Sequence, residues 1–197
     1  MLESSVLRSL VWTDYRLAVL FLVSFPLVLL IWAALKQNAA IQRLLTIYWK
    51  VASLLMITVY LMIGGFSISF IAAVMARVLI PISLWFWVDL NEEIREQPDN
   101  SLKLTFNAWR WAVTLYCILG TAISLTFLPC AFSKAQLAAA NCQAWLEAPL
   151  LYQRYLHNGY TNGFLGFFGI LGLVIYVLSL AWFVFFRLGK QGRQAGS

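Results

Sequence analysis

Residues 50–96 read KVASLLMITVYLMIGGFSISFIAAVMARVLIPISLWFWVDLNEEIRE, and they decide the fold. From Val51 to Ala76 this stretch contains no charged residue, and only the pair Gly64-Gly65 interrupts it. A helix rises ~1.5 Å per residue and crosses the ~30 Å hydrocarbon layer of a bilayer in about 20 residues. Residues 51–76 are therefore predicted to form a membrane-spanning helix.

The second half of the stretch predicts a helix at the membrane surface. The apolar residues 78–88 follow Arg77, are too short to span a bilayer and contain Pro81, which breaks helices. They end in the aromatic run 85–87, which is typical of a membrane interface. Arg77 is expected to snorkel to the inner surface. We expect a kinked interfacial helix over residues 78–96 that ends in water.

The composition fits a protein built for lipid. Hydrophobic residues make up 62% of the chain and charged residues 11%, against roughly 45–50% and ~25% in soluble domains. The net charge of +6 would suit nucleic acid in a soluble protein, but no basic stripe interleaved with aromatics is present. The basic residues stand at the ends of apolar segments, where they anchor helices. The expected partner is the lipid bilayer, with no nucleic acid.

The rest of the chain supplies three more spans. The predicted fold is an all-α membrane protein in one domain, residues 1–197, a bundle of four transmembrane helices with interfacial amphipathic helices. A surface helix is expected over residues 1–12, with Thr13 or Asp14 as the cap of the next helix. Spans besides residues 51–76 are predicted at residues 17–35, 108–128 and 163–186, with an outward loop at 129–162. Pro26 is expected to kink the first span and free backbone groups that Ser24, water or a neighbour would satisfy.

A bundle of five spans is the alternative. In it, Gly64-Gly65 is a turn between two spans, one carrying Lys50 and the other carrying Arg77 near its centre. Each such charge costs ~2.5–3.5 kcal/mol on insertion scales. The sequence therefore favours four spans.

The distribution of Lys and Arg sets the orientation, because cytoplasmic connections carry more of them. With four spans, the side of the termini holds Arg8, Arg16, Arg77, Arg95, Lys103, Arg187, Lys190 and Arg193. The opposite side holds Lys36, Arg43, Lys50, Lys134 and Arg154. Both termini are therefore predicted to be cytoplasmic. Five spans would leave the C-terminus inside if the N-terminus is outside, and the loop 129–162 faces outward either way.

Two cysteines lie in the outward loop, Cys130 and Cys142. Their spacing does not match a Cys-x-x-Cys redox motif, and zinc needs more ligands than two thiols and the lone His157. A structural disulfide in an oxidising compartment is one interpretation, and two buried free thiols are the other. No metal site is predicted.

Four carboxylates at helical spacing i, i+3, i+4 and i+7 are the candidate partner-binding residues: Asp89, Glu92, Glu93 and Glu96. They would share one face of a helix and could dock a basic partner. The alternatives are a solvated helix end and a weak divalent-cation site completed by ligands from elsewhere.

Glycines recur at every third position of the last span: Gly163, Gly166, Gly169 and Gly172. Such a row forms a broad groove that another helix can approach closely. Helix packing is the first interpretation, and a groove for pigment or lipid is the second.

The runs YWKVASLLMI at residues 48–57 and LWFWVDLNEEI at residues 84–94 resemble a family of small membrane proteins of cyanobacteria, catalogued as a domain of unknown function. The resemblance covers most of the chain. It implies a photosynthetic bacterium and hence a thylakoid or plasma membrane, and it supplies no active-site residue.

The predicted function is non-enzymatic. No nucleophile–base pair, phosphate loop or dinucleotide motif is recognisable. We expect an accessory or assembly subunit that binds other membrane proteins, with the photosynthetic membrane as its candidate location and pigment or lipid as the candidate cofactor. The alternatives are a small membrane transporter or channel and a membrane thiol oxidoreductase.

Overall fold

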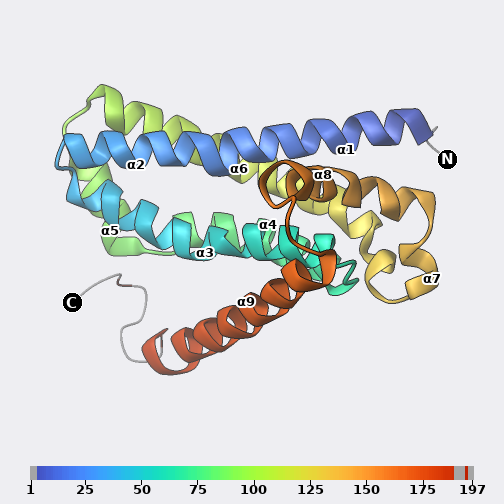
Figure 1. The fold of residues 1–197 in the computed structure, drawn as a ribbon. Helices are drawn as coiled ribbons and strands as arrows, with labels where there is room; N and C mark the ends of the chain where they lie inside the picture. The colour runs from blue at the N-terminus through green and yellow to red at the C-terminus, as the bar shows by residue number, and fades with distance from the viewer. Residues whose placement is uncertain (1–3, 189–193, 195–197) are drawn as a thin grey trace.

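The computed structural model describes residues 4–188 and residue 194. Over this part of the chain the regular structure is helical. The first helical path consists of α1 (Ser4–Ala18), the π-helical η1 (Val19–Ser24) and α2 (Phe25–Leu35). These three segments form one long rod along the top of the bundle in Figure 1.

The prediction of a separate surface helix over residues 1–12 is wrong, because α1 runs without a break into the first apolar segment. Ala18 and Ser24, at the two junctions, both have right-handed helical φ and ψ angles. Asp14 therefore lies inside a helix and does not cap one.

Pro26 explains the π-helical turn. Proline has no N–H, so the carbonyls of Leu22 and Phe21 lose the partner that lies four or five residues further along the helix. Side chains of the neighbouring helices donate to these two carbonyls in place of the missing N–H. The buried Tyr48 hydroxyl donates to the Leu22 carbonyl at 2.6 Å, and Trp109 Nε1 donates to the Phe21 carbonyl at 2.9 Å. A neighbour, not Ser24, thus satisfies the backbone that Pro26 frees.

The prediction of a single span over residues 51–76 is also wrong. The structure has α3 (Ala39–Ile63) and α4 (Ile68–Trp85), with a tight turn at Gly64-Gly65. Gly65 has φ +69°, a left-handed conformation that glycine adopts most readily. The residues 78–85, expected in an interfacial helix, form the last turns of α4, so only α5 (Val88–Glu96) remains of that helix.

The remaining elements are α6 (Ser101–Thr126), the 3₁₀ turn η2 (Leu128–Ala131), α7 (Lys134–Leu137), α8 (Ala140–Leu156), α9 (Asn162–Trp182) and the π-helical η3 (Phe183–Leu188). In Figure 1, α5 closes one end of the bundle, and α7 and α8 cover the opposite end. From that covered end α9 runs diagonally away.

Five helical stretches of the described chain are long and apolar enough to cross a membrane: Ser5–Leu35, Ala39–Ile63, Ile68–Trp85, Ser101–Thr126 and Asn162–Phe186. The predicted all-α membrane class is confirmed, but the count of four spans is not. Five crossings would place the two ends of the chain on opposite sides of the membrane, in contrast to the prediction that both termini are cytoplasmic. Lys190 and Arg193, used in that prediction, lie outside the described residues.

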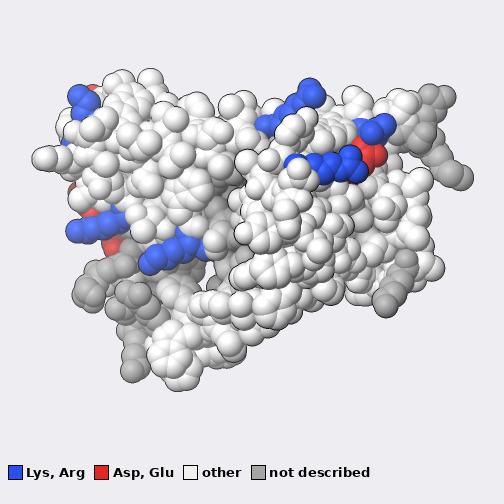
Figure 2. Space-filling view, in the orientation of Figure 1, with Lys and Arg blue, Asp and Glu red and all other residues white. Residues whose placement is uncertain are grey.

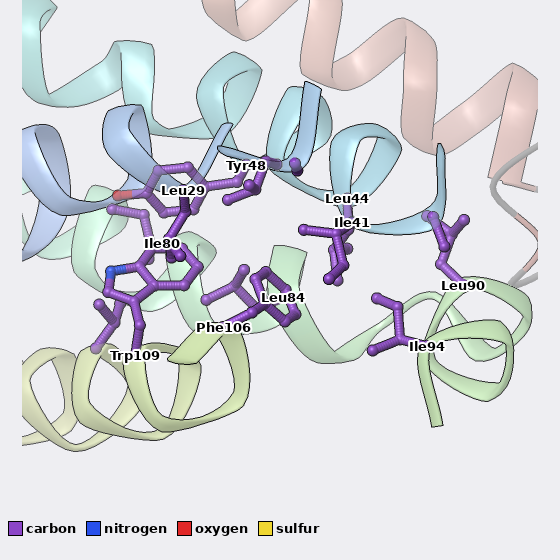
Figure 3. Close-up of a cluster of buried hydrophobic side chains, with 14 of the residues drawn as sticks. Leu29, Ile41, Leu44, Tyr48, Ile80, Leu84, Leu90, Ile94, Phe106 and Trp109 are labelled. Atoms are coloured by element: carbon purple, nitrogen blue, oxygen red, sulfur yellow. The ribbon is translucent and has the colours of Figure 1, made fainter. Parts of the chain in front are cut away.

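The main core lies in the half of the bundle next to α5. Tyr48, Phe106 and Trp109 pack there edge-on or tilted, with ring centroids 5.2–5.8 Å apart. Figure 3 shows Leu90 and Ile94 of α5 directed toward the same cluster. Burial of this apolar face of α5 fixes the opposite, charged face outward.

Candidate functional site

A buried ion pair joins the first helix to α4. A terminal nitrogen of Arg77 donates to the Asp14 carboxylate, and the side chains are only 9% and 19% exposed. Arg77 therefore does not snorkel to a surface as predicted. A buried charge is stable only when it is paired and its hydrogen-bonding capacity is used, and both conditions hold here.

Residues of α6 complete the surroundings of this pair. Arg77 Nη1 donates to the Ser124 hydroxyl and, at 3.3 Å, to the Gly120 carbonyl. A Cβ at Gly120 would lie 3.1 Å from Arg77 Nε, so the glycine leaves room for the guanidinium. The Tyr116 hydroxyl donates to Asp14 Oδ1 at 2.8 Å. The pair thus links α1, α4 and α6 at one level.

A large cavity opens beside this ion pair, with a volume of about 880 Å³. It lies between the first helix and α3, and α8 and parts of α4 and α6 contribute to its walls. Its volume falls within the ~300–1,000 Å³ range of small-molecule sites, and its lining is mainly apolar. In Figure 2 the middle of the surface is hollowed beside the part that α8 covers.

Trp145 connects the cavity to the ion pair. The centre of the Arg77 guanidinium lies 5.8 Å from the centroid of the Trp145 ring, a cation–π distance. The Trp145 carbonyl accepts from the Tyr15 hydroxyl at 2.7 Å. The indole N–H of Trp145, in contrast, is buried and has no hydrogen-bond partner, and the same is true of Trp49. Both tryptophans line the cavity.

The cysteines of the outward loop, Cys130 and Cys142, form a disulfide in the structure. They pack with Trp145, Phe70 and Val11 in a small core under α8. The disulfide therefore attaches the first turn of α8 to η2, the turn that follows α6, next to the cavity wall that α8 provides.

The candidate acidic residues all lie on α5. Glu92, Glu93 and Glu96 are exposed, and Asp89 is half-buried. Arg95 lies 4.0 Å from Glu92, a weak exposed pair. The acidic face of α5, defined as these four carboxylates, therefore presents at least three charges to the surroundings.

Three of the four glycines predicted to form a groove pack against α3 of the same chain. A Cβ at Gly166 would lie 2.8 Å from Gly64 Cα, and one at Gly169 would lie 2.8 Å from the Leu61 nitrogen. Gly172 faces Ile57, but nothing lies within 4 Å of a Cβ at Gly163. The row is thus a helix-packing seam, and α3 fills the space that a pigment would need.

Sequence reasoning missed the roles of Asp14 and Tyr116 and the cavity. One signal was present, because Asp14 is the only acidic residue in the five candidate spans. Within the described residues, no group of three or more His, Cys, Asp or Glu side chains could hold a metal ion.

A comparison with protein families gives a match to the family described as "Protein of unknown function (DUF3177)" over residues 8–196. No curated protein and no solved structure matches the chain.

Proposed function

This chain belongs to the DUF3177 family, and we propose that it is a non-enzymatic accessory or assembly subunit that binds other membrane proteins. The observation that carries the proposal is the position of α9. Only 17% of the most apolar stretch of this helix is buried inside the chain, against 22–44% of the corresponding stretches of the other four candidate spans. It packs chiefly along α3 through its glycine seam, which leaves most of its circumference for contacts outside the chain.

The free surface of α9 is apolar and rich in aromatic residues. Its exposed side chains include Phe164, Phe167, Phe168, Val174, Leu178 and Trp182. Figure 2 shows a surface without charged residues over this helix. Helices of another membrane protein could pack on it through van der Waals contacts, which drive association within a bilayer.

The acidic face of α5 supplies a second contact. It stands at the end of the bundle opposite α8, and we propose that this end faces the cytoplasm. The connections and helix ends on the α5 side carry Lys36, Arg43, Arg95, Lys103 and Arg187. The α8 side carries Arg8, Arg16, Lys134 and Arg154. This orientation also puts the disulfide in an oxidising space, in agreement with where disulfides persist.

The resemblance of the runs at residues 48–57 and 84–94 supports a thylakoid or plasma membrane location in a photosynthetic bacterium. Fractionation of thylakoid and plasma membranes, followed by immunodetection of the chain, tests this part of the proposal. Enrichment in a different membrane would contradict it.

Site-specific photo-crosslinking tests the role of α9. A photoreactive residue at Leu178 on α9 should form adducts with a defined membrane protein. Leu119 on α6 is the matched control, because both side chains are 65% exposed on apolar helices. If both positions give only lipid adducts, α9 faces the bilayer and the proposal is wrong.

A further inference from the structure

The cavity beside the ion pair has charged residues at one end, called the polar end, and only uncharged, mainly apolar ones at the other. Two contacts show how the helices on either side of the cavity run: Tyr15 donates to the Met62 sulfur at 3.2 Å, and Tyr48 donates to the Leu22 carbonyl. The first helix and α3 therefore run antiparallel along it. Trp12 and Ser24 mark the extent of its lining on the first helix, about 18 Å at ~1.5 Å per residue. This length is close to half of the ~30 Å hydrocarbon layer.

The polar end carries an excess of positive charge. Three cations stand there, Arg8, Arg16 and Arg77, with two carboxylates, Asp14 and Glu147. Arg8 pairs with Glu147 at 2.6 Å, and Arg77 pairs with Asp14. Arg16 lines the cavity, is exposed and takes part in no ion pair with a described residue.

The free charge at this end favours one class of ligand. Arg16 has no ion-pair partner among the described residues, and its guanidinium offers several hydrogen-bond donors. Such a group favours a ligand whose polar part is an anion. The indole N–H of Trp145 is fully buried in the same wall, so it lies out of reach of a ligand in the cavity.

The opposite end is suited to a hydrocarbon chain. Its walls come from Leu22 and Val23 of η1 and from Ala52 of α3, and Leu55 and Met56 line the stretch between the two ends. Methionine is flexible and fits irregular apolar shapes. We propose that the cavity binds one anionic membrane amphiphile, with its acidic headgroup at Arg16 and its acyl chain along η1 and α3.

A neutral lipophile such as a quinone or a carotenoid fits this cavity less well. It would fill the apolar part but would leave the Arg16 charge without a counterion at the mouth. The anionic headgroup could belong to a glycerolipid or to a free fatty acid, because both have an acidic group attached to an acyl chain.

The test is retention of lipid by the full-length protein. The purified chain is incorporated into vesicles of equal parts phosphatidylglycerol and phosphatidylcholine and extracted in mild detergent, and bound lipid is counted by native mass spectrometry. We expect one phosphatidylglycerol per chain. A parallel sample with added oleate separates the two headgroup sources, since displacement by oleate shows that a free carboxylate is sufficient.

Two variants and two controls locate the bound lipid. Arg16→Gln should weaken retention of the anionic lipid about tenfold, the loss expected for one charge-assisted hydrogen bond. Ala148→Phe should abolish retention, because Ala148 lines the cavity. The controls are Arg43→Gln, an exposed cation at the far end of the bundle, and Ala122→Phe on the exposed side of α6. Both controls should bind as the native protein does.

Three results would overturn the proposal: equal retention of phosphatidylcholine, preferential retention of a neutral lipid, or unchanged binding in Arg16→Gln. The last criterion does not depend on Ala148→Phe, which could fail to fold, because Arg16 is exposed and lies outside the core. Thermal unfolding and an intact disulfide check the fold of each variant.

Discussion

The ion pair between Asp14 and Arg77 should dominate the stability of the bundle, and Asp14→Asn is the sharpest perturbation of it. Asparagine keeps the shape of the side chain but removes its charge. Arg77 would then remain 9% exposed with Ser124, the Gly120 carbonyl and a neutral amide as its partners. Breaking a buried ion pair from one side costs about 3–5 kcal/mol. Because hydrogen bonds survive, we expect about 3 kcal/mol for this variant.

A double-mutant cycle separates the interaction energy of the ion pair from the contributions of its surroundings. Arg77→Met removes the cation, fills the site with a flexible apolar side chain and should also cost about 3 kcal/mol, because Asp14 is left with Tyr116 alone. In Asp14→Asn/Arg77→Met no charge remains unpaired. Its loss of stability should therefore be close to that of either single variant, which corresponds to a coupling energy of about 2–3 kcal/mol.

The assay is reversible unfolding in mixed detergent micelles, followed by circular dichroism. The control is Asp99→Asn: Asp99 is 99% exposed and pairs with Lys103 at 3.0 Å, so this change should leave the unfolding midpoint unchanged. Strictly additive losses in the double variant would refute the reasoning. So would a loss below about 1 kcal/mol for Asp14→Asn, the range found for single hydrogen bonds inside membranes.

Three further predictions concern the seam, the disulfide and the acidic face. Gly166→Leu should destabilise the fold by at least about 2 kcal/mol in the same unfolding assay, whereas Gly163→Leu, which meets open space, should have little effect. Reduction of the disulfide Cys130–Cys142, whose members are 12 positions apart, should cost roughly 3 kcal/mol, and thiol labelling should detect two new thiols. Glu93→Lys should weaken capture of a basic partner without changing membrane insertion, and higher salt should weaken capture by the native chain, as pull-downs at graded salt would measure.

The fold class could be predicted from the sequence because apolar length alone identifies helices that cross a bilayer. The predicted spans at residues 17–35, 108–128 and 163–186 each fall on a long apolar helix of the structure. Such local patterns do not record which helices meet. The seam of Gly166 and Gly169 was recognisable as a packing surface, but its partner, α3, became evident only from the fold.

The cavity could not be predicted, because its walls come from segments that are distant in sequence. Asp14, Met56 and Trp145 line the same space, and no spacing rule connects them. The unpaired indole N–H of Trp145 is equally a property of the packed structure. The acidic face of α5, in contrast, depends on positions within one helix and could be recognised from spacing alone.

The sequence favoured one span over a turn at Gly64-Gly65 because insertion scales treat each helix as if it were alone in lipid. In the bundle, Arg77 has Asp14 as counterion, which offsets the cost of burying its charge. Lys50, the other charge in that comparison, is exposed on α3. The eight acidic residues of the chain include only one, Asp14, within the candidate spans. That single carboxylate is the one counterion that the spans offer, but Arg110 in α6 is buried as well. Charge balance alone does not choose between Arg77 and Arg110, and the pairing of Arg77 with Asp14 follows only from the packing of the first helix beside α4.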